Sequence, residues 1–381
     1  MKNPVSRILS TLIFIMMSSN LFSQVTFRII RLPENTDNSD IFLASGLNGW
    51  NPADAQFKFK KDLEGNYSLT IPKPGKKAEY KITKGSWDSV ETDENGNATA
   101  NRIYDPAISE LTVPIEIKSW NIPKEKKHTA NSHVRILSEH FKIPQLNSTR
   151  KIWIYLPPDY QTSGKKYPVI YMQDGQNLFD DYTSFSGEWQ VDETLDAIYN
   201  ETGRSAIVIG IDNGGDQRLA EYSPWNNAKY KTTGQGNLYA DFLAKTLKPF
   251  IDKTYRTQRQ TSKTIILGSS IGGLISLYTA VKYPETFGKA GIFSPAFWFV
   301  SKDLKNYLNR NRKNLRHSEF YFVAGKDEDE TMVPEIEATQ SELINNSVDP
   351  KNIIVKIDQD GTHSETYWKR ELKQALMWLL K

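Results

Sequence analysis

The chain has 381 residues, of which 38% are hydrophobic and 24% are charged. This composition is ordinary for a soluble globular protein, and the length suffices for two or three domains. Because the formal net charge is only +3, the composition gives no support for a nucleic acid partner. The chain has no cysteine, which excludes disulfide bonds, a thiol nucleophile and a lipid anchor on cysteine.

Residues 1–23 have the pattern of a secretory signal peptide. Lys2 and Arg7 give a positive start, and the mostly apolar stretch 8–17 is too short to span a membrane securely. Small residues such as Ser23 suit a cleavage region. No later apolar run reaches spanning length. We therefore expect an exported protein, periplasmic or secreted, without a membrane span in its mature form.

Residues 24–121 are predicted to form a β-domain. Short strand-like runs follow one another and are separated by turns rich in glycine, asparagine and proline. The runs are 25–30, 40–44, 67–71, 78–83 and 110–117. This pattern is typical of a β-sandwich, and we expect an immunoglobulin-like one. The charged residues 122–132 that follow are predicted to be a linker.

Residues 133–381 alternate between strand and helix patterns, which predicts an α/β domain. The predicted strands are 134–138, 151–156, 167–172, 206–211, 264–267, 289–293, 319–324 and 353–357. The predicted helices are 191–200, 238–255, 274–281 and 365–380. The alternation indicates a mainly parallel sheet covered on both faces. Ligands of such sheets bind at the carboxyl ends of the strands.

The stretch Gly268-Ser269-Ser270-Ile271-Gly272 matches the pattern G-x-S-x-G. It lies between the predicted strand 264–267 and the predicted helix 274–281, which is the setting of a nucleophile elbow. The flanking glycines fit a turn where side chains would collide with the strand and the helix. We predict that Ser270 is the nucleophile. The alternative is a glycine- and serine-rich turn without a catalytic role.

A serine hydroxyl needs a base, which in turn needs an orienting acid. In this architecture the chain order is serine, acid, histidine, so His317 and His363 are the candidates for the base. His317 precedes a predicted strand, at the wrong end of the sheet. His363 follows the last predicted strand, at the correct end, and we predict it as the base. The acid is expected among the four carboxylates of residues 327–330, which position alone does not separate.

An oxyanion hole needs two N–H groups, each worth about 3–4 kcal/mol in the transition state. Ile271, which follows the nucleophile, is predicted to supply one of them. The other is expected from the loop that follows the strand 167–172, where Gly175 allows a close approach. Within this loop Gln176 is the favoured donor, with Asn177 as the alternative.

The second domain resembles the Putative esterase family of α/β-hydrolases, which includes enterochelin, feruloyl and acetyl-xylan esterases. The motifs that carry the resemblance are Gln173 to Phe179, Glu188-Trp189-Gln190-Val191-Asp192, Ile211-Asp212-Asn213, Arg218 to Trp225, Gly268 to Gly273 and Gly361-Thr362-His363. The resemblance covers about residues 133–381 and implies an α/β-hydrolase fold and a serine esterase. It also implies Glu328 as the acid, with Asp327 as runner-up, although some siderophore esterases work with serine and histidine alone.

The first domain resembles starch- and glycogen-binding sandwich domains. The resemblance rests on Asn48-Gly49-Trp50-Asn51-Pro52, Tyr80-Lys81-Ile82 and Gly85 to Glu91. It implies that Trp50, Trp87 and Lys81 contact sugar. The family's tryptophan before the acidic residue is replaced by Val90. The alternative is that the tryptophans pack the sandwich and that the domain is a spacer or a lid.

Further residues are candidates for substrate binding. Trp189 belongs to this group. Arg218, Glu221, Tyr222 and Trp225 are expected to line the substrate mouth, or Arg218 and Glu221 form a structural pair that holds the loop. No zinc-binding H-E-x-x-H pattern and no phosphate or dinucleotide fingerprint is present, so neither a metal nor a cofactor is expected.

The expected function is that of an exported serine esterase with an acyl-enzyme intermediate. Acyl or feruloyl decorations on polysaccharide are the first choice of substrate, and a ferric siderophore lactone is the second. Acyl transfer to a sugar hydroxyl shares the same acyl-enzyme. An alternative from a different functional class is a non-catalytic glycan-binding protein on a hydrolase scaffold. This alternative requires a broken triad, whereas Ser270 and His363 are both present.

Overall fold

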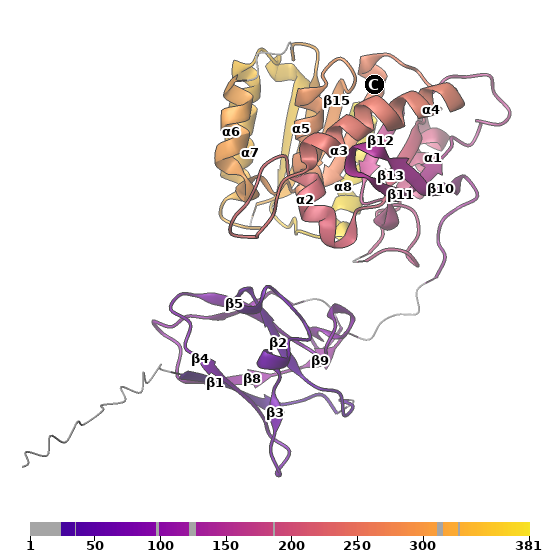
Figure 1. Cartoon of the computed structure of the whole chain (residues 1–381). Coiled ribbons are helices and arrows are strands. Elements are labelled where there is room, and N and C mark those ends of the chain that lie inside the picture. The colour runs from indigo at the N-terminus through magenta and orange to yellow at the C-terminus, as the bar shows by residue number, and fades with distance from the viewer. Residues whose placement is uncertain are drawn as a thin grey trace, which may run out of the picture. The chain divides into compact units, whose positions relative to one another are not determined.

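A computed structural model describes residues 24–34, 36–96, 99–121, 127–185, 187–310, 315–326 and 328–381 (Figure 1). The predicted signal peptide, 1–23, and the second candidate acid, Asp327, lie outside these residues. The chain divides into two compact units, Met1–Glu125 and Lys126–Lys381. Each unit has its own hydrophobic core.

The first unit consists of short strands in three sheets. Their bounds are β1 Gln24–Arg31, β2 Phe42–Ser45, β3 Lys60–Lys61, β4 Tyr67–Pro72, β5 Ala78–Thr83, β6 Glu91–Thr92, β7 Arg102–Tyr104, β8 Thr112–Glu116 and β9 Ser119–Trp120. The sheet orders are β3-β4-β1-β8, β2-β5-β7 and β6-β9. Alternate residues of β1 and β4 are buried, and Phe27 of β1 packs edge-on against Tyr80 of β5. The two larger sheets thus share one core. The expectation that the first unit is an immunoglobulin-like sandwich stays a prediction.

The second unit is built on one sheet of eight strands in the order β10-β11-β13-β12-β14-β15-β16-β17. Their bounds are β10 Val134–Ile143, β11 Ser148–Tyr155, β12 Val169–Gln173, β13 Ile207–Ile211, β14 Thr264–Ser269, β15 Lys289–Phe293, β16 Glu319–Gly325 and β17 Ile353–Asp358. The pairs from β13 to β17 are all parallel, while β10 and β11 run antiparallel at one edge. Strands β12 to β15 are buried along their whole length, as expected for a sheet covered on both faces.

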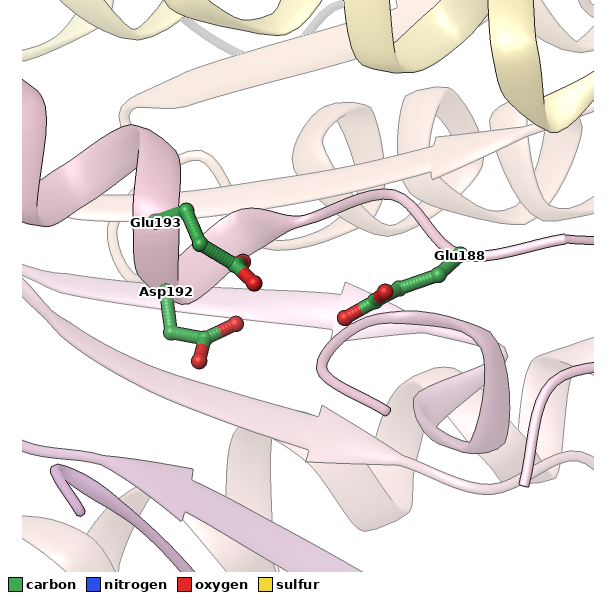
Figure 2. Close-up of side chains that lie close together, drawn as sticks. All are labelled: Glu188, Asp192 and Glu193. Carbon is green, nitrogen blue, oxygen red and sulfur yellow. The ribbon is translucent and has the colours of Figure 1, made fainter. Parts of the chain in front are cut away.

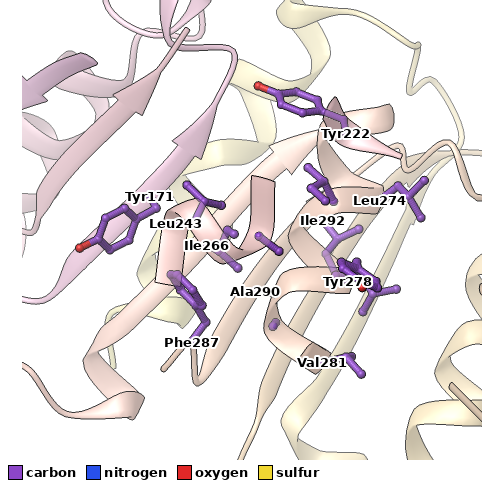
Figure 3. Packing of buried hydrophobic residues seen from close by; sticks show 14 of the residues in the cluster. Tyr171, Tyr222, Leu243, Ile266, Leu274, Tyr278, Val281, Phe287, Ala290 and Ile292 are labelled. Atoms are coloured by element: carbon purple, nitrogen blue, oxygen red, sulfur yellow. The ribbon is translucent and has the colours of Figure 1, made fainter. Parts of the chain in front are cut away.

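Helices cover both faces of this sheet. Their bounds are α1 Val191–Thr202, α2 Arg218–Tyr222, α3 Gly236–Phe242, α4 Lys248–Thr254, α5 Ile271–Lys282, α6 Ser301–Arg310, α7 Met332–Asn345 and α8 Glu365–Leu379. Side chains of α3 to α7 share one cluster with Ile266 of β14. Figure 3 shows part of this cluster, with Leu274, Tyr278 and Val281 of α5 near Ile266. Its neighbours Ile265 and Leu267 point the other way, into a cluster with α1 and α8. The single helix predicted over 238–255 is α3 and α4 joined by a π-helical turn, Leu243–Leu247.

The second unit begins earlier than the sequence predicts. In the predicted linker, Thr129 N–H donates to Asp180 at 3.0 Å and the Asn131 amide donates to Asp196 at 2.9 Å. Residues 127–132 are therefore fixed to the second unit by side-chain carboxylates, a contact that the linker's charged composition does not reveal. Within the described part of the chain, no helix is long and apolar enough to cross a membrane.

Candidate active site

Ser270 lies at the tip of the turn between β14 and α5. Its backbone has φ 57° and ψ −127°, a conformation that L-residues rarely adopt and that the surrounding contacts enforce. Ser270 N–H donates to Phe293 O at 2.9 Å, and Ala296 N–H donates to Ser270 O at 3.0 Å. A Cβ on Gly268 would lie 2.6 Å from Gly272 O, so only glycine fits beneath the serine. The turn exposes part of Ser270 at the carboxyl edge of the sheet.

His363 and Glu328 form a pair at the same edge of the sheet. His363 Nδ1 lies 2.9 Å from Glu328 Oε2. A carboxylate only accepts hydrogen bonds, so it favours a proton on Nδ1 and leaves Nε2 as an acceptor. The other carboxylate oxygen, Oε1, accepts from Gly325 N–H at 2.6 Å and from Ser294 Oγ at 2.7 Å. Only 1% of the Glu328 side chain is exposed, against 42% of the His363 side chain.

A close approach of two glycines places the loops that carry Glu328 and His363 side by side. Gly325 ends β16, and Gly361 lies two residues before His363. A Cβ on Gly361 would lie 2.5 Å from Gly325 Cα and 2.7 Å from Tyr367 Cζ. Any side chain at either position would therefore push the two loops apart.

The turn Gly175–Asn177 after β12 lies beside the elbow, because β12 pairs with β14. Asn177 N–H is used within the turn, since it donates to Asp174 O at 2.9 Å. Among the described residues Gln176 N–H has no acceptor, and Ile271 N–H opens α5, where helix geometry leaves it without one. Of the two alternatives for the second donor, Gln176 therefore has the available N–H group.

Comparison with known proteins places the chain in a family. Residues 143–379 match the model of the Putative esterase family. The chain belongs to this family. It is 25% identical to the uncharacterized protein YbbA of Bacillus subtilis over 255 residues, which is 64% of this chain and 95% of that protein.

Solved structures support the same fold. A ferulic acid esterase covers 65% of this chain, with 98% of its own length, at TM-score 0.51 and 18% identity. The enterochelin esterase of Shigella flexneri covers 93% of this chain, with 91% of its own length, at TM-score 0.55 and 14% identity. The predicted α/β-hydrolase fold is thus confirmed. The protein is a carboxylic ester hydrolase that acts on a small-molecule ester.

In this esterase, Arg218 supports the turn that follows β12. Its guanidinium makes two hydrogen bonds to Asp174, at 2.6 and 2.8 Å. Asp174 precedes Gly175 and has φ 57°, so its strained backbone is held by this ion pair and by Asn213, whose amide donates to the carboxylate at 2.8 Å. Asp174 N–H also donates to Tyr222 OH at 3.3 Å. Arg218 and Tyr222 therefore act on the shape of the turn.

Several predicted substrate contacts prove to be structural. Glu221 does not pair with Arg218; it is buried and binds Arg150 at 2.6 Å. Tyr222 is fully buried, and Trp189, which is 3% exposed, packs against Phe293 and Trp368. The prediction that Glu221, Tyr222 and Trp189 line the substrate mouth is wrong, because the packing of the esterase core hides them from solvent.

Trp225 and Arg218 are only partly buried. The Trp225 ring lies 5.5 Å from Tyr278 and 5.7 Å from Tyr307, between α5 and α6. These contacts anchor the loop that follows α2. The position of Trp225 is thus explained by packing, as that of Arg218 is by its ion pair.

Exposed aromatic residues near the elbow were missed by the sequence analysis. Trp298 is 41% exposed and lies two residues after Ala296, whose N–H binds the Ser270 carbonyl. Tyr230 is 40% exposed, and its ring lies 5.8 Å from that of Trp298. Phe185 is 71% exposed, and its N–H donates to the Asn177 side chain at 2.9 Å. The run Phe297-Trp298-Phe299, which begins four residues after the end of β15, was the available signal.

The first unit of the esterase keeps only part of the predicted sugar-binding set. Trp50 and Trp87 are partly exposed, and their rings lie 6.2 Å apart at 42°. Lys81, however, is 8% exposed and donates to Thr99 Oγ1 at 2.7 Å. Burial lowers the pKa of Lys81. The prediction that Lys81 binds sugar hydroxyls is wrong, because its ammonium group already holds the chain at Thr99.

Proposed function

We propose that this protein is an exported serine esterase that removes aromatic acyl groups of the feruloyl type from polysaccharide through an acyl-enzyme on Ser270. The observation that carries the mechanism is the pairing of His363 with the buried Glu328 at the sheet edge that also bears Ser270. The proposal assigns Ser270 as nucleophile, His363 as base, Glu328 as orienting acid, and Ile271 and Gln176 as oxyanion donors.

In the first half-reaction Ser270 Oγ attacks the ester carbonyl while His363 Nε2 takes its proton. The negative charge on the carbonyl oxygen is stabilised by the N–H groups of Ile271 and Gln176. The tetrahedral intermediate collapses, the alcohol leaves with the proton from His363, and an acyl-serine remains. Water then attacks the acyl group, gives its proton to His363, and the carboxylic acid is released as Ser270 regains its proton.

Glu328 keeps the imidazole in the productive tautomer and stabilises the imidazolium that forms in each half-reaction. Its carboxylate suits this role because Gly325 N–H and Ser294 Oγ bind the oxygen that does not face the histidine. The Trp368 indole, which donates to Ser294 Oγ at 2.8 Å and lies edge-on to the His363 ring, limits the movement of both groups.

The choice of an aromatic acyl group rests on the exposed rings of Trp298, Tyr230 and Phe185. Trp298 follows Ala296, which is hydrogen-bonded to Ser270, and Phe185 is hydrogen-bonded to Asn177 of the turn after β12. Flat aromatic groups stack well on such rings. The likeness to a ferulic acid esterase over 65% of the chain supports the same class of substrate. Export is supported by the signal-like pattern of residues 1–23. The partly exposed pair of Trp50 and Trp87 offers a surface for the polysaccharide.

A ferric catecholate lactone is the second candidate substrate, since it also carries aromatic acyl groups. It is favoured by one observation, that the likeness to the enterochelin esterase extends over 93% of this chain. Both candidates share the chemistry at Ser270 and differ in the scaffold that bears the ester.

The test is to measure kcat/KM for methyl ferulate, feruloylated and acetylated xylan, and a ferric catecholate lactone. We expect methyl ferulate to be hydrolysed faster than the acetyl ester, and Trp298→Ala to reduce hydrolysis of ferulate more than that of p-nitrophenyl acetate. A clear preference for the lactone would replace the polysaccharide proposal with the second candidate. Retention of full activity by Ser270→Ala would refute the mechanism.

A further inference from the structure

Three carboxylates converge outside the proposed catalytic site, at the start of α1. Glu188 approaches from the preceding loop, while Asp192 and Glu193 lie in the first turn of the helix (Figure 2). One oxygen atom from each of the three lies within 4.8 Å of the other two.

Each of the three carboxylates has one oxygen without a hydrogen-bond partner. Glu188 Oε1, Asp192 Oδ1 and Glu193 Oε2 are all shielded from solvent and unpartnered in the described structure. Glu188 is 7% exposed and Asp192 is fully buried. In two of these groups the second oxygen is satisfied by a neighbour.

These neighbours belong to the segment that precedes β10. Thr129 Oγ1 donates to Glu188 Oε2, and Asn131 N–H donates to Asp192 Oδ2, both at 2.9 Å. The hydrogen bonds fix the orientation of the two carboxylates. Their remaining oxygens are thereby turned toward the common space, where nothing in the described structure donates to them.

The charge of the cluster is not balanced by the protein. Within the described ranges no lysine or arginine forms an ion pair with Glu188, Asp192 or Glu193. Unpaired buried carboxylates are costly and call for a cation or for added protons. Burial accordingly raises the pKa of Glu188 to about 7, and it raises the pKa of Asp192 as well.

We propose that Glu188, Asp192 and Glu193 bind a divalent cation, and that this cation is Ca²⁺. Oxygen ligands without nitrogen or sulfur suit the hard cations Ca²⁺ and Mg²⁺. All three oxygens lie within 4.8 Å of one another, so one cation can contact them all. Mg²⁺ is usually held by only one or two carboxylates and keeps several waters, whereas Ca²⁺ takes 6–8 oxygen ligands in flexible geometry. Three convergent carboxylates therefore favour Ca²⁺.

Bound Ca²⁺ would join the loop at Glu188 to the first turn of α1. Residues 129–131 are tied to the same carboxylates by the hydrogen bonds of Thr129 and Asn131. The loop is itself hydrogen-bonded to the oxyanion region, since Trp189 N–H donates to Asn177 O at 2.9 Å and Val191 N–H donates to Leu178 O at 3.0 Å. The cation therefore has a structural role, in holding the loop that lies behind the oxyanion turn.

The experiment uses the full chain after removal of cations with EDTA. Thermal unfolding is followed with added Ca²⁺ or Mg²⁺, and Ca²⁺ binding is titrated by calorimetry. We expect one Ca²⁺ per chain and a rise in Tm of about 5–10 °C when free Ca²⁺ is about 100 times the Kd. Neither measurement requires an active enzyme, so failure of the proposed function would leave this test valid.

Asp192→Asn should abolish the Ca²⁺-dependent rise in Tm without lowering the Tm measured in EDTA, because it removes a buried charge. Glu201→Gln is the matched control, since Glu201 lies at the other end of α1 and pairs with Lys373 on the surface. The control should respond to Ca²⁺ like the unaltered chain. Should Asp192→Asn not fold, Glu188→Gln makes the same test.

Three results would overturn the proposal. The first is an absence of Ca²⁺ binding and of any shift in Tm at millimolar Ca²⁺, which would mean that shared protons neutralise the cluster. The second is an unchanged response in both Asp192→Asn and Glu188→Gln, which would place the cation elsewhere. The third is binding of Mg²⁺ in preference to Ca²⁺, which would refute the choice of metal.

Discussion

Replacing Glu328 with glutamine tests the proposed mechanism most directly, because the structure dictates how the new side chain would lie. Gly325 N–H and Ser294 Oγ both donate to Glu328 Oε1. The glutamine would therefore turn its oxygen toward them and its NH₂ group toward His363. An amide donor facing Nδ1 forces the imidazole proton onto Nε2, and an Nε2–H group cannot take the proton of Ser270.

The expected loss of activity follows from the free energy needed to place the glutamine amide in the opposite orientation, with its oxygen toward His363. Turning the amide round would set its NH₂ group against the fixed N–H of Gly325 and disturb the Ser294 hydroxyl. One unsatisfied donor costs about 1–3 kcal/mol and one lost hydrogen bond about 1 kcal/mol, so the productive tautomer becomes about 30 to 1000 times rarer. The neutral amide also fails to stabilise the imidazolium. We therefore expect kcat/KM to fall by about 10²–10⁴ in total.

The assay is hydrolysis of p-nitrophenyl acetate by Glu328→Gln, with circular dichroism to verify folding. Asp329→Asn is the control in the same loop, because Asp329 caps α7 through Met332 N–H at 2.9 Å and makes no contact with His363. Its activity should change less than threefold. If Glu328→Gln keeps more than one fifth of the activity, the assignment of Glu328 is refuted, and Asp327→Asn should be measured in its place.

Two further predictions concern the proposed oxyanion turn and Asp212, a partly buried acid next to Gly175. In Gly175→Ala the new methyl group would lie 2.8 Å from Asp212 N, so the turn must move by about half an ångström. We therefore expect kcat for an aryl ester to fall about 10- to 100-fold with little change in KM. An unchanged kcat would contradict the role of Gln176. Burial raises the pKa of Asp212 to about 6, so the stability that this acid contributes is present below pH 4 and is lost as the pH rises through 6. In urea denaturation at pH 7.5, Asp212→Asn should therefore have a free energy of unfolding about 1–3 kcal/mol higher than that of the unaltered chain, with no such gain at pH 4. An equal gain at both pH values would contradict the reasoning.

The sequence predicted the strands of the large sheet because their signals are local, whereas the helices α2, α6 and α7 were missed. The strands β12 to β15 are continuous apolar runs, and the elbow at Ser270 is a contiguous pattern of glycines between a strand and a helix. The choice of His363 over His317 followed from the end of the strand at which each lies. Such arguments need only chain order and the direction of parallel strands.

The sequence could not separate exposed from buried polar residues in the loops. Glu221 was paired with Arg218 because they are neighbours along the chain, whereas Arg150 from β11 and Asp174 from the end of β12 are their partners in space. Lys81 was assigned to sugar binding from a family resemblance, and the sequence did not reveal that its side chain is buried against Thr99. The acidic cluster at Glu188 was also invisible, because its oxygens are brought together by the packing of the loop on α1 and have no regular spacing.

The position of His363 after the last strand gives the esterase a weak point. Strand β17 forms the edge of the sheet and is bonded to β16 alone, and five of its six residues are only partly buried. Edge strands with few buried side chains open locally at a lower free energy than the whole domain. Release of β17 would carry His363 away from Glu328 while the rest of the sheet stayed folded. Heat inactivation at a temperature below that of global unfolding, reversible on cooling, is the expected consequence.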